Sequence, residues 1–398
     1  MSPIEQELLK ITAAALFEKE YEICADLNYA AVLDEASSQS VYGLAYPMVR
    51  SALEKDLSAK YEELFFNYVV QNTVIESGHA AVHELMTEHR IPYVTIKGCA
   101  SAKYYPDPSL RCMGDVDFLV RKQDFEKTVK LVEDQGFSLI EEDDGSHHQA
   151  LLNGNTTWEV HHSVSGIPDG IMGKLCRNKL SGIIEKAVLY STDSGEFLIP
   201  DEYHHGLVML LHTVEHIAST GVGLRHICDW AVFVNSMSEE KFTELLRKDL
   251  KDIGLWRFAK ILTALCTRYL GLPEREFAKD IDDALLSDMM EDVLAGGNFG
   301  KKDVDRYHGS MLTSKDSGGG FVKSAFQTLN KRAKVRMPIT GKVPVLLPIG
   351  WAYVGVNHLV MIRKGQRPAI HAKQTLEKST KRRELNKSYR LFEIENKN

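Results

Sequence analysis

The sequence has few cysteines and lacks a recognisable export signal. Six cysteines are spread over 398 residues, and no two of them form a Cys-x-x-Cys pair. This spacing excludes a zinc knuckle and gives no sign of a disulfide framework. Residues 1–20 show no basic start followed by an apolar stretch, so we expect no signal peptide. These absences favour a protein of the reducing cytoplasm.

Charge is distributed unevenly along a chain that shows no repeat of fixed period. Residues 321–398 contain 17 basic and 4 acidic side chains, whereas the first 320 residues contain 31 basic and 51 acidic ones. A basic C-terminal segment on an acidic body indicates either an anionic partner or a solvated tail. The acidic body argues against long nucleic acids as partners.

The hydrophobic pattern divides the chain into four parts. Apolar residues recur at three- and four-residue spacing in residues 1–85 and again in 201–300, which predicts two helical regions. Residues 86–200 combine short β-branched runs with an amphipathic helix and a polar Gly154–Asn155 turn. Loop signals, including Asp316–Gly320, lead into the basic segment 321–398. The predicted class is α+β, with a central mixed sheet between N-terminal and C-terminal helical regions.

The most informative stretch holds two aspartates separated by one apolar residue. Asp115 and Asp117 lie on a predicted strand, and because side chains alternate between strand faces, both carboxylates point the same way. Val116 and Phe118 then point into the core. Mg²⁺ relieves the repulsion between two such carboxylates and also binds phosphate oxygens. Two surface aspartates on an edge strand are the alternative interpretation.

Two further segments strengthen the prediction of a metal site. A short strand ends at Lys97 and Gly98, where a helix begins, and such a junction offers backbone N–H groups to an anion such as a triphosphate. In a later strand, Glu159 and His161 share one face, which adds a third carboxylate. In a two-metal cluster of this kind, one ion holds the nucleotide phosphates and the other lowers the pKa of the attacking hydroxyl.

This order of strand, glycine, helix, Asp-x-Asp and later carboxylate resembles the DNA polymerase β-like nucleotidyltransferase superfamily. The segments YYPDPSLRCMGDVDFLV and WEVHH are similar to the group described as uncharacterised nucleotidyltransferases of bacteria, over about residues 60–235. The resemblance implies a nucleotidyltransferase core at residues 86–200 and Asp115, Asp117 and Glu159 as metal ligands. Gly98 is followed here by Cys99, where the family has Gly or Ser, and the gap to Asp115 is slightly longer than usual.

Residues around the carboxylates have open roles. Lys97 either neutralises a phosphate, next to a nucleotide-binding Gly98, or caps the end of its strand. Arg111 either contacts phosphate or orients a carboxylate, or else it forms a structural salt bridge. His161 either supports Glu159 from behind or is a hydrogen-bonded core residue.

A second motif, H-x-x-E-H, is formed by His212, Glu215 and His216. It is the inverted zinc-protease motif, in which two imidazoles on one helix face bind Zn²⁺ and the glutamate is the general base. The next predicted helix offers His226, but its neighbour Arg225 is unfavourable beside zinc. We therefore expect no catalytic zinc here. We expect the substrate cleft to be lined by His212, His216, Arg225 and Asp229, with His161 as a further candidate.

The stretch Val343–Ile362 has about the length of a membrane span. Its prolines, Gly350, Asn357 and His358 weaken a spanning helix. Two interpretations remain, burial in a C-terminal lobe or attachment to an anionic membrane surface through the apolar stretch and its basic flanks. Attachment would place the protein at the inner membrane face, and burial would leave it in the cytoplasm.

The favoured function is metal-dependent transfer of a nucleoside monophosphate from an NTP, with Mg²⁺ or Mn²⁺ as cofactor and pyrophosphate as product. The acceptor hydroxyl or phosphate is open and includes small molecules, sugars, peptides, proteins and tRNA. One alternative is a catalytically inactive nucleotide-binding or regulatory protein of the same fold. A less favoured one is a zinc metalloprotease that uses His212, Glu215 and His216.

Overall fold

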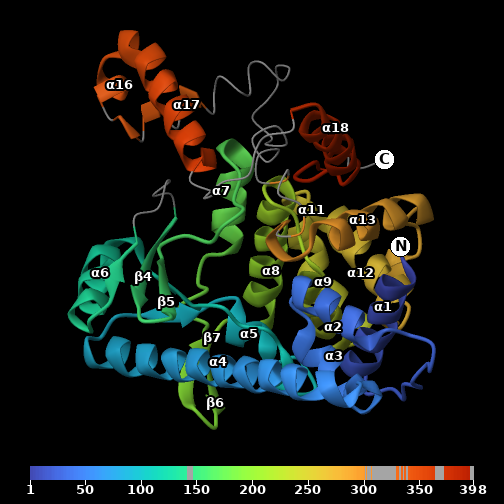
Figure 1. The fold of residues 1–398 in the computed structure, drawn as a ribbon. Helices are drawn as coiled ribbons and strands as arrows, with labels where there is room; N and C mark the ends of the chain where they lie inside the picture. Colours follow the sequence, from blue (N-terminus) through green and yellow to red (C-terminus); the bar gives the residue numbers. More distant parts are fainter. Residues whose placement is uncertain are drawn as a thin grey trace.

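The computed structural model describes residues 1–140, 147–300, 302, 306, 329–330, 333–334, 336–337, 339–363 and 372–394. The predicted Asp316–Gly320 linker lies outside the described residues, as do Lys331 and Arg332 of the basic segment. Within the described part, helices surround a mixed sheet (Figure 1), which confirms the predicted α+β class.

The N-terminal region consists of helices whose ends follow from local sequence. The first begins where Ser2 accepts a hydrogen bond from the Glu5 N–H and the Glu5 side chain accepts one from the Ser2 N–H, a capping box followed by Pro3. The last and longest of them runs along the base of the sheet in Figure 1 and packs against strands of the core. The four helices are α1 (Pro3–Leu16), α2 (Tyr29–Ser38), α3 (Tyr42–Val49) and α4 (Lys55–Glu88).

A five-stranded sheet carries the Asp-x-Asp segment at an interior position. Its strands are β1 (Tyr93–Thr95), β2 (Val116–Val120), β3 (Ser138–Leu139), β4 (His148–Asn153) and β5 (Thr156–His161). Their order is β1-β2-β5-β4-β3, in which only the β2–β5 pair is parallel and the other pairs are antiparallel. Because β2 lies between β1 and β5, the alternative of two aspartates on an edge strand is wrong.

One face of this sheet carries apolar side chains on which α4 packs. Val116 and Phe118 are completely buried there, together with Val82 and Met86 of α4. The approach is close, since a Cβ on Gly78 of α4 would lie 2.7 Å from the Val116 side chain. Burial of this face leaves the opposite face for the carboxylates. α5 (Gly98–Ala102) and α6 (Phe125–Asp134) precede and follow β2.

Residues 170–199 contain elements that the sequence pattern did not reveal. They are α7 (Gly170–Lys179) and the hairpin of β6 (Val188–Thr192) and β7 (Gly195–Ile199), in which β7 packs against β1 and α4. Phe197 and Ile199 of β7 are buried, whereas Val188 and Leu189 are exposed. The sequence of β6 begins with three adjacent apolar or aromatic residues, Val188 to Tyr190, so it lacks the alternation that marks a half-buried strand.

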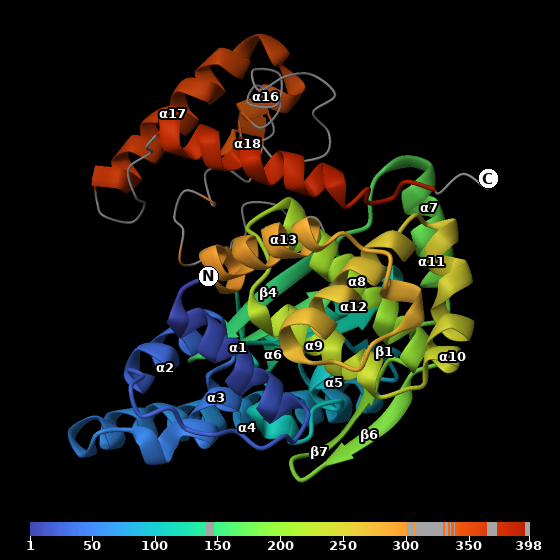
Figure 2. The ribbon, with the colours of Figure 1, turned by 90° about the vertical axis from the view of Figure 1, so that its right-hand side faces the viewer.

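Helices return after residue 200 and join the N-terminal ones in a large apolar core. Side chains of α1, α2 and α3 pack in one cluster with those of the helices that follow the sheet. In Figure 2 these later helices stack beside the sheet, with α9 and α12 against each other. The elements are α8 (Glu202–Ala218), α9 (Leu224–Asn235), α10 (Glu239–Phe242), α11 (Lys248–Asp252), α12 (Trp256–Leu270) and α13 (Asp283–Gly296).

The described C-terminal helices are α16 (Ile339–Lys342), α17 (Leu347–Arg363) and α18 (Ala372–Ser388). α18 lies against α13, and its Arg382 donates to the Ile217 carbonyl at the end of α8. α16 and α17 lie apart from the helical body in both views (Figures 1 and 2). Among the described residues, no helix is both long and apolar enough to cross a bilayer.

Candidate active site

Asp117 and Glu159 lie side by side because β2 and β5 pair in parallel. The register sets Asp117 opposite Glu159. The ammonium of Lys97 lies between the two carboxylates, 2.6 Å from Asp117 Oδ1 and 3.5 Å from Glu159 Oε2. Asp117 is 2% exposed, whereas the Lys97 and Glu159 side chains are partly exposed to the cleft. The structure therefore places two of the three predicted ligands on one face of the sheet, around a positive charge.

His161 joins the same cluster from the end of β5. Its Nε2 lies 2.8 Å from Asp117 Oδ1 and 3.2 Å from Glu159 Oε2, and the ring is fully buried. Burial and Lys97 oppose protonation, but the hydrogen bonds to both carboxylates raise the pKa of His161. Burial also opposes the charge of Asp117, but Lys97 and His161 hold the pKa of this carboxyl well below its ordinary value. Asp117 is thus ionised and fixed between two donors.

Asp115 lies just before β2 and lines the same cleft as Asp117 and Glu159. The charge of Asp117, followed by burial and the charge of Glu159, raises the pKa of Asp115 to about 8. This rise records the mutual repulsion of carboxylates crowded on one face. A cation at the cleft would relieve that repulsion.

The Lys97–Gly98 junction positions the lysine with an unusual backbone. Lys97 adopts φ 59° and ψ −129° at the N-terminal end of α5, a conformation that non-glycine residues rarely adopt. Burial opposes its charge, yet Asp117 and Glu159 hold the pKa of Lys97 above its usual value. At Gly98, a Cβ would meet His79 Nε2 at 3.8 Å and the Asp115 carbonyl at 3.9 Å, which are ordinary contacts. Packing within the protein therefore does not by itself require glycine there.

Arg111 is bound to Asp229 of α9 rather than to the carboxylate cluster. Its Nε donates to Asp229 Oδ1 at 3.0 Å and its Nη2 to Oδ2 at 2.8 Å, while Tyr105 Oη donates to Oδ1 at 2.7 Å. Arg111 Nη1 and Arg225 Nη1 both donate to the Cys112 carbonyl, at 3.0 and 3.2 Å. The geometry is that of the structural salt bridge considered for Arg111, and it anchors the loop before Asp115 to α9.

A cleft of about 330 Å³ lies over the carboxylates. It is bordered by the carboxylate cluster, by Arg111 and Asp229, and by side chains of α8 and α9. Among these, His212 Nε2 lies 3.1 Å from His216 Nε2, and Ser165 Oγ lies 3.2 Å from His212 Nδ1. His212, His216, Arg225 and Asp229 all line this cleft. His161, the other residue predicted for the cleft, is fully buried and is not among the lining residues.

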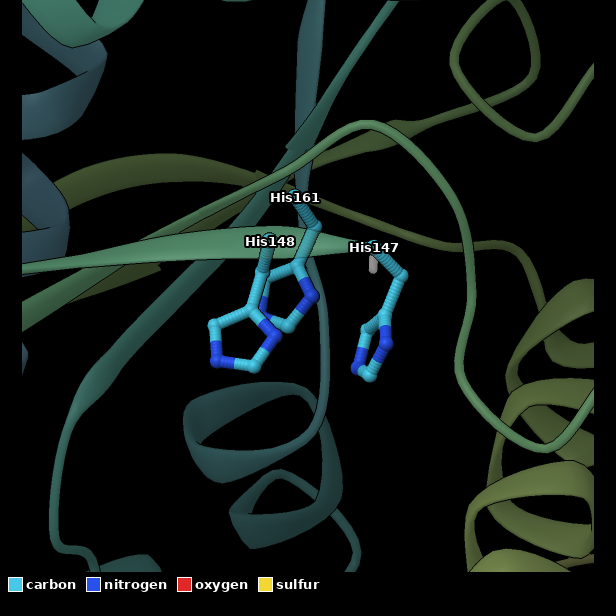
Figure 3. Close-up of side chains that lie close together, drawn as sticks. All are labelled: His147, His148 and His161. Atoms are coloured by element: carbon cyan, nitrogen blue, oxygen red, sulfur yellow. The ribbon is translucent and has the colours of Figure 1, made fainter. Parts of the chain in front are cut away.

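Two functional candidates were missed from the sequence, namely His147 and His148, and a third, His226, was discounted. Figure 3 shows His147, His148 and His161 with their rings close together. The rings of His148 and His161 stack at 4.8 Å, because β4 and β5 pair with these two residues opposite each other. The signal was present, since the Gly154–Asn155 turn fixes this register. His226 lies within reach of His212 and His216, although the sequence argument had discounted it because of Arg225.

Comparison with known proteins gives a match at the level of a family. No curated protein matches the chain significantly. A family model described as uncharacterised nucleotidyltransferase matches residues 26–271, a range that includes Lys97, the Asp-x-Asp strand, Glu159 and the α8–α9 pair. The match covers more than half of the chain and indicates nucleotidyl transfer as its general activity. The chain therefore belongs to this family of uncharacterised nucleotidyltransferases.

Proposed function

We propose that the protein is an active, metal-dependent enzyme that transfers a nucleoside monophosphate from an NTP to an acceptor and releases pyrophosphate. The observation that carries this proposal is the pairing of Asp117 with Glu159 around the Lys97 ammonium, next to Asp115. The same arrangement supports the DNA polymerase β-like superfamily as the wider group.

The donor set fits Mg²⁺ or Mn²⁺. Asp117, Glu159 and His161 present ligand atoms within 4.8 Å of one another, and Asp115 adds a carboxylate whose raised pKa reflects unrelieved repulsion. Carboxylate oxygens are the preferred ligands of these hard cations, which also bind nucleotide phosphates. When bound, such ions would supply charge stabilisation to the transferring phosphoryl group. We propose Asp115, Asp117 and Glu159 as the residues that hold them.

Side chains of the protein would position the nucleotide and accept the proton that the acceptor loses. In the transfer, an acceptor oxygen forms a bond to the α-phosphorus, and the bond from that phosphorus to the pyrophosphate oxygen breaks. The acceptor proton passes to one of the three carboxylates. Lys97 offsets negative charge at the cluster and is close enough to do the same for nucleotide phosphates. Gly98, which packing does not require, leaves the backbone open to an approaching phosphate.

The runner-up is a nucleotide-binding protein of the same fold without turnover. The three carboxylates argue against it, because crowding like charges around the buried Asp117 is unfavourable unless a cation is bound there. Binding of an NTP without release of pyrophosphate, under conditions that include the acceptor, would favour this alternative.

The test is nucleotidyl transfer by the full-length protein and by the Asp117→Asn variant. Each of four NTPs is supplied with Mg²⁺ or Mn²⁺ to cell extract, and the modified product is identified by mass spectrometry. We expect transfer by the wild type and its loss in Asp117→Asn, which removes one anionic ligand with little change of shape. Glu159→Gln should behave likewise, whereas Asp134→Asn, at an exposed position on α6, should retain activity.

Circular dichroism and thermal melting are measured on every variant, so that loss of activity is separated from loss of fold. The proposal is wrong if Asp117→Asn and Glu159→Gln both turn over at the wild-type rate.

A further inference from the structure

We propose that His212, His216 and His226 form a second metal site, for a divalent transition ion of the Zn²⁺ class. The three imidazoles come from α8 and α9, which border the cleft over the carboxylates. Their donor set is nitrogen, whereas that of the carboxylate site is mainly oxygen. This inference goes beyond nucleotidyl transfer and does not depend on it.

The two imidazoles of α8 already have the spacing of metal ligands. His212 and His216 are four residues apart on one helix, so they share a face. Their Nε2 atoms lie 3.1 Å apart. Two nitrogens at about 2.0–2.1 Å from a tetrahedral Zn²⁺ are separated by about 3.3 Å. Adding His226 keeps all three ligand atoms within 4.8 Å of one another.

Contacts around these rings leave nitrogen atoms that could bind a metal. Ser165 Oγ lies 3.2 Å from His212 Nδ1, a contact that orients the ring and leaves Nε2 for the ion. His226 is buried, and its Nε2 has no hydrogen-bond partner among the described residues. Its Nδ1 receives only a long contact, 3.4 Å, from the Gly223 N–H. Ligation through Nε2 would place the ring proton on Nδ1, so this long contact from Gly223 would be given up for the bond to the ion.

Charged groups of both signs lie near the three imidazoles. The positive charges of Lys97 and Arg225 act against a cation here. Asp117 beside His212 and Asp229 beside His226 act in its favour. Three neutral nitrogen ligands select a borderline transition ion over Mg²⁺.

The competing explanation is a hydrogen bond between the two α8 imidazoles with no ion, in which one Nε2–H donates to the other ring. That bond pairs the Nε2 atoms of His212 and His216 but leaves His226 Nε2 buried and unpaired among the described residues. An ion would engage one nitrogen of each of the three rings, including His226 Nε2. This proposal departs from the expectation that these histidines line the cleft without zinc, because α9 supplies a third imidazole.

The experiment measures metal content and affinity of the full-length protein, purified without chelators or a metal-affinity tag and assayed without NTP. We expect about one Zn²⁺ per chain by elemental analysis. After removal of the metal, added Co²⁺ should give the visible absorption of tetrahedral nitrogen coordination. His226→Ala and His212→Ala should each lower Zn²⁺ affinity at least tenfold.

Matched variants separate this site from others. His89→Ala, at the end of α4, should bind Zn²⁺ as the wild type does. Asp117→Asn, which disables the proposed carboxylate site, should still bind one ion, with its affinity lowered less than tenfold because one favourable charge is lost. His226→Gln is measured beside His226→Ala, with circular dichroism on both, so that a misfolded variant is recognised. The proposal is overturned if the metal-free wild type takes up no more Zn²⁺ than His226→Gln, or if Asp117→Asn loses the ion. Loss of transferase activity without loss of Zn²⁺ would contradict neither the zinc site nor the proposed carboxylate site.

Discussion

Replacing Asp229 with asparagine tests the buried ion pair that joins the Asp-x-Asp loop to α9. The Asp229 carboxylate receives two hydrogen bonds from Arg111 and one from Tyr105, at 2.7–3.0 Å. Arg111 and Asp229 are 5% and 8% exposed. The asparagine side chain would keep the shape and one acceptor oxygen but remove the charge that offsets a buried guanidinium.

Two lines of reasoning set the expected loss of stability. Although burial opposes ionisation, Arg111 lowers the pKa of Asp229 from 3.8 to about 2, which corresponds to about 2 kcal/mol. Removing one partner of a buried ion pair costs about 3–5 kcal/mol, because an uncompensated charge stays buried. Asparagine keeps one acceptor, so we expect Asp229→Asn to lower the free energy of unfolding by about 3 kcal/mol.

The pH dependence gives an independent check. Because the pKa of Asp229 is lower in the folded protein, its stabilising effect is present above the unfolded pKa of about 4 and is lost as the pH falls through about 2. The difference in unfolding free energy between wild type and Asp229→Asn should therefore shrink by about 1 kcal/mol from pH 6 to pH 3.

Urea denaturation followed by circular dichroism measures both effects. The control is Glu185→Gln, which breaks the exposed Arg121–Glu185 ion pair and should cost no more than about 1 kcal/mol. A loss below about 1 kcal/mol in Asp229→Asn, with no dependence on pH, would refute the reasoning. It would mean that Arg111 and Asp229 are solvated and do not anchor the loop.

Two further predictions concern the packing of α8 and the surface of α17. Gly166→Ala should lower stability by more than about 3 kcal/mol in thermal melting, because φ is +76° and a Cβ would lie 1.9 Å from the Leu211 carbonyl oxygen. The control is Gly154→Ala, where φ is +58° but the space is open, and it should lower stability by only about 1 kcal/mol. Equal losses would contradict this packing. Ile349, Tyr353 and Val356 are apolar side chains exposed on α17. We expect the protein to sediment with anionic but not neutral vesicles, and the binding to fall as salt rises, because each basic residue near the surface contributes about 1 kcal/mol. Val356→Asp should reduce the binding, because it removes an exposed apolar side chain and adds a negative charge. Absence of binding at low salt would contradict attachment.

The alternation of side chains between the two faces of a strand could be predicted, because it depends only on neighbouring residues. The spacing of Asp115 and Asp117 indicated a common face, and the structure buries Val116 and Phe118 behind them. The register of His148 opposite His161 was equally accessible, since a two-residue turn at Gly154–Asn155 determines which residues pair. That inference was available and was not drawn.

The partners of these residues were decided by tertiary structure. Parallel pairing of β2 with β5 brings Glu159 beside Asp117, although an α-helix and two strands intervene in the chain. The partner of Arg111 is Asp229, 118 residues away, and the third imidazole beside His212 and His216 depends on how α9 packs on α8. A local pattern specifies which face a side chain occupies, because backbone geometry repeats every few residues. Which faces meet depends on many small packing terms summed over the whole core, and those are not encoded in any single segment.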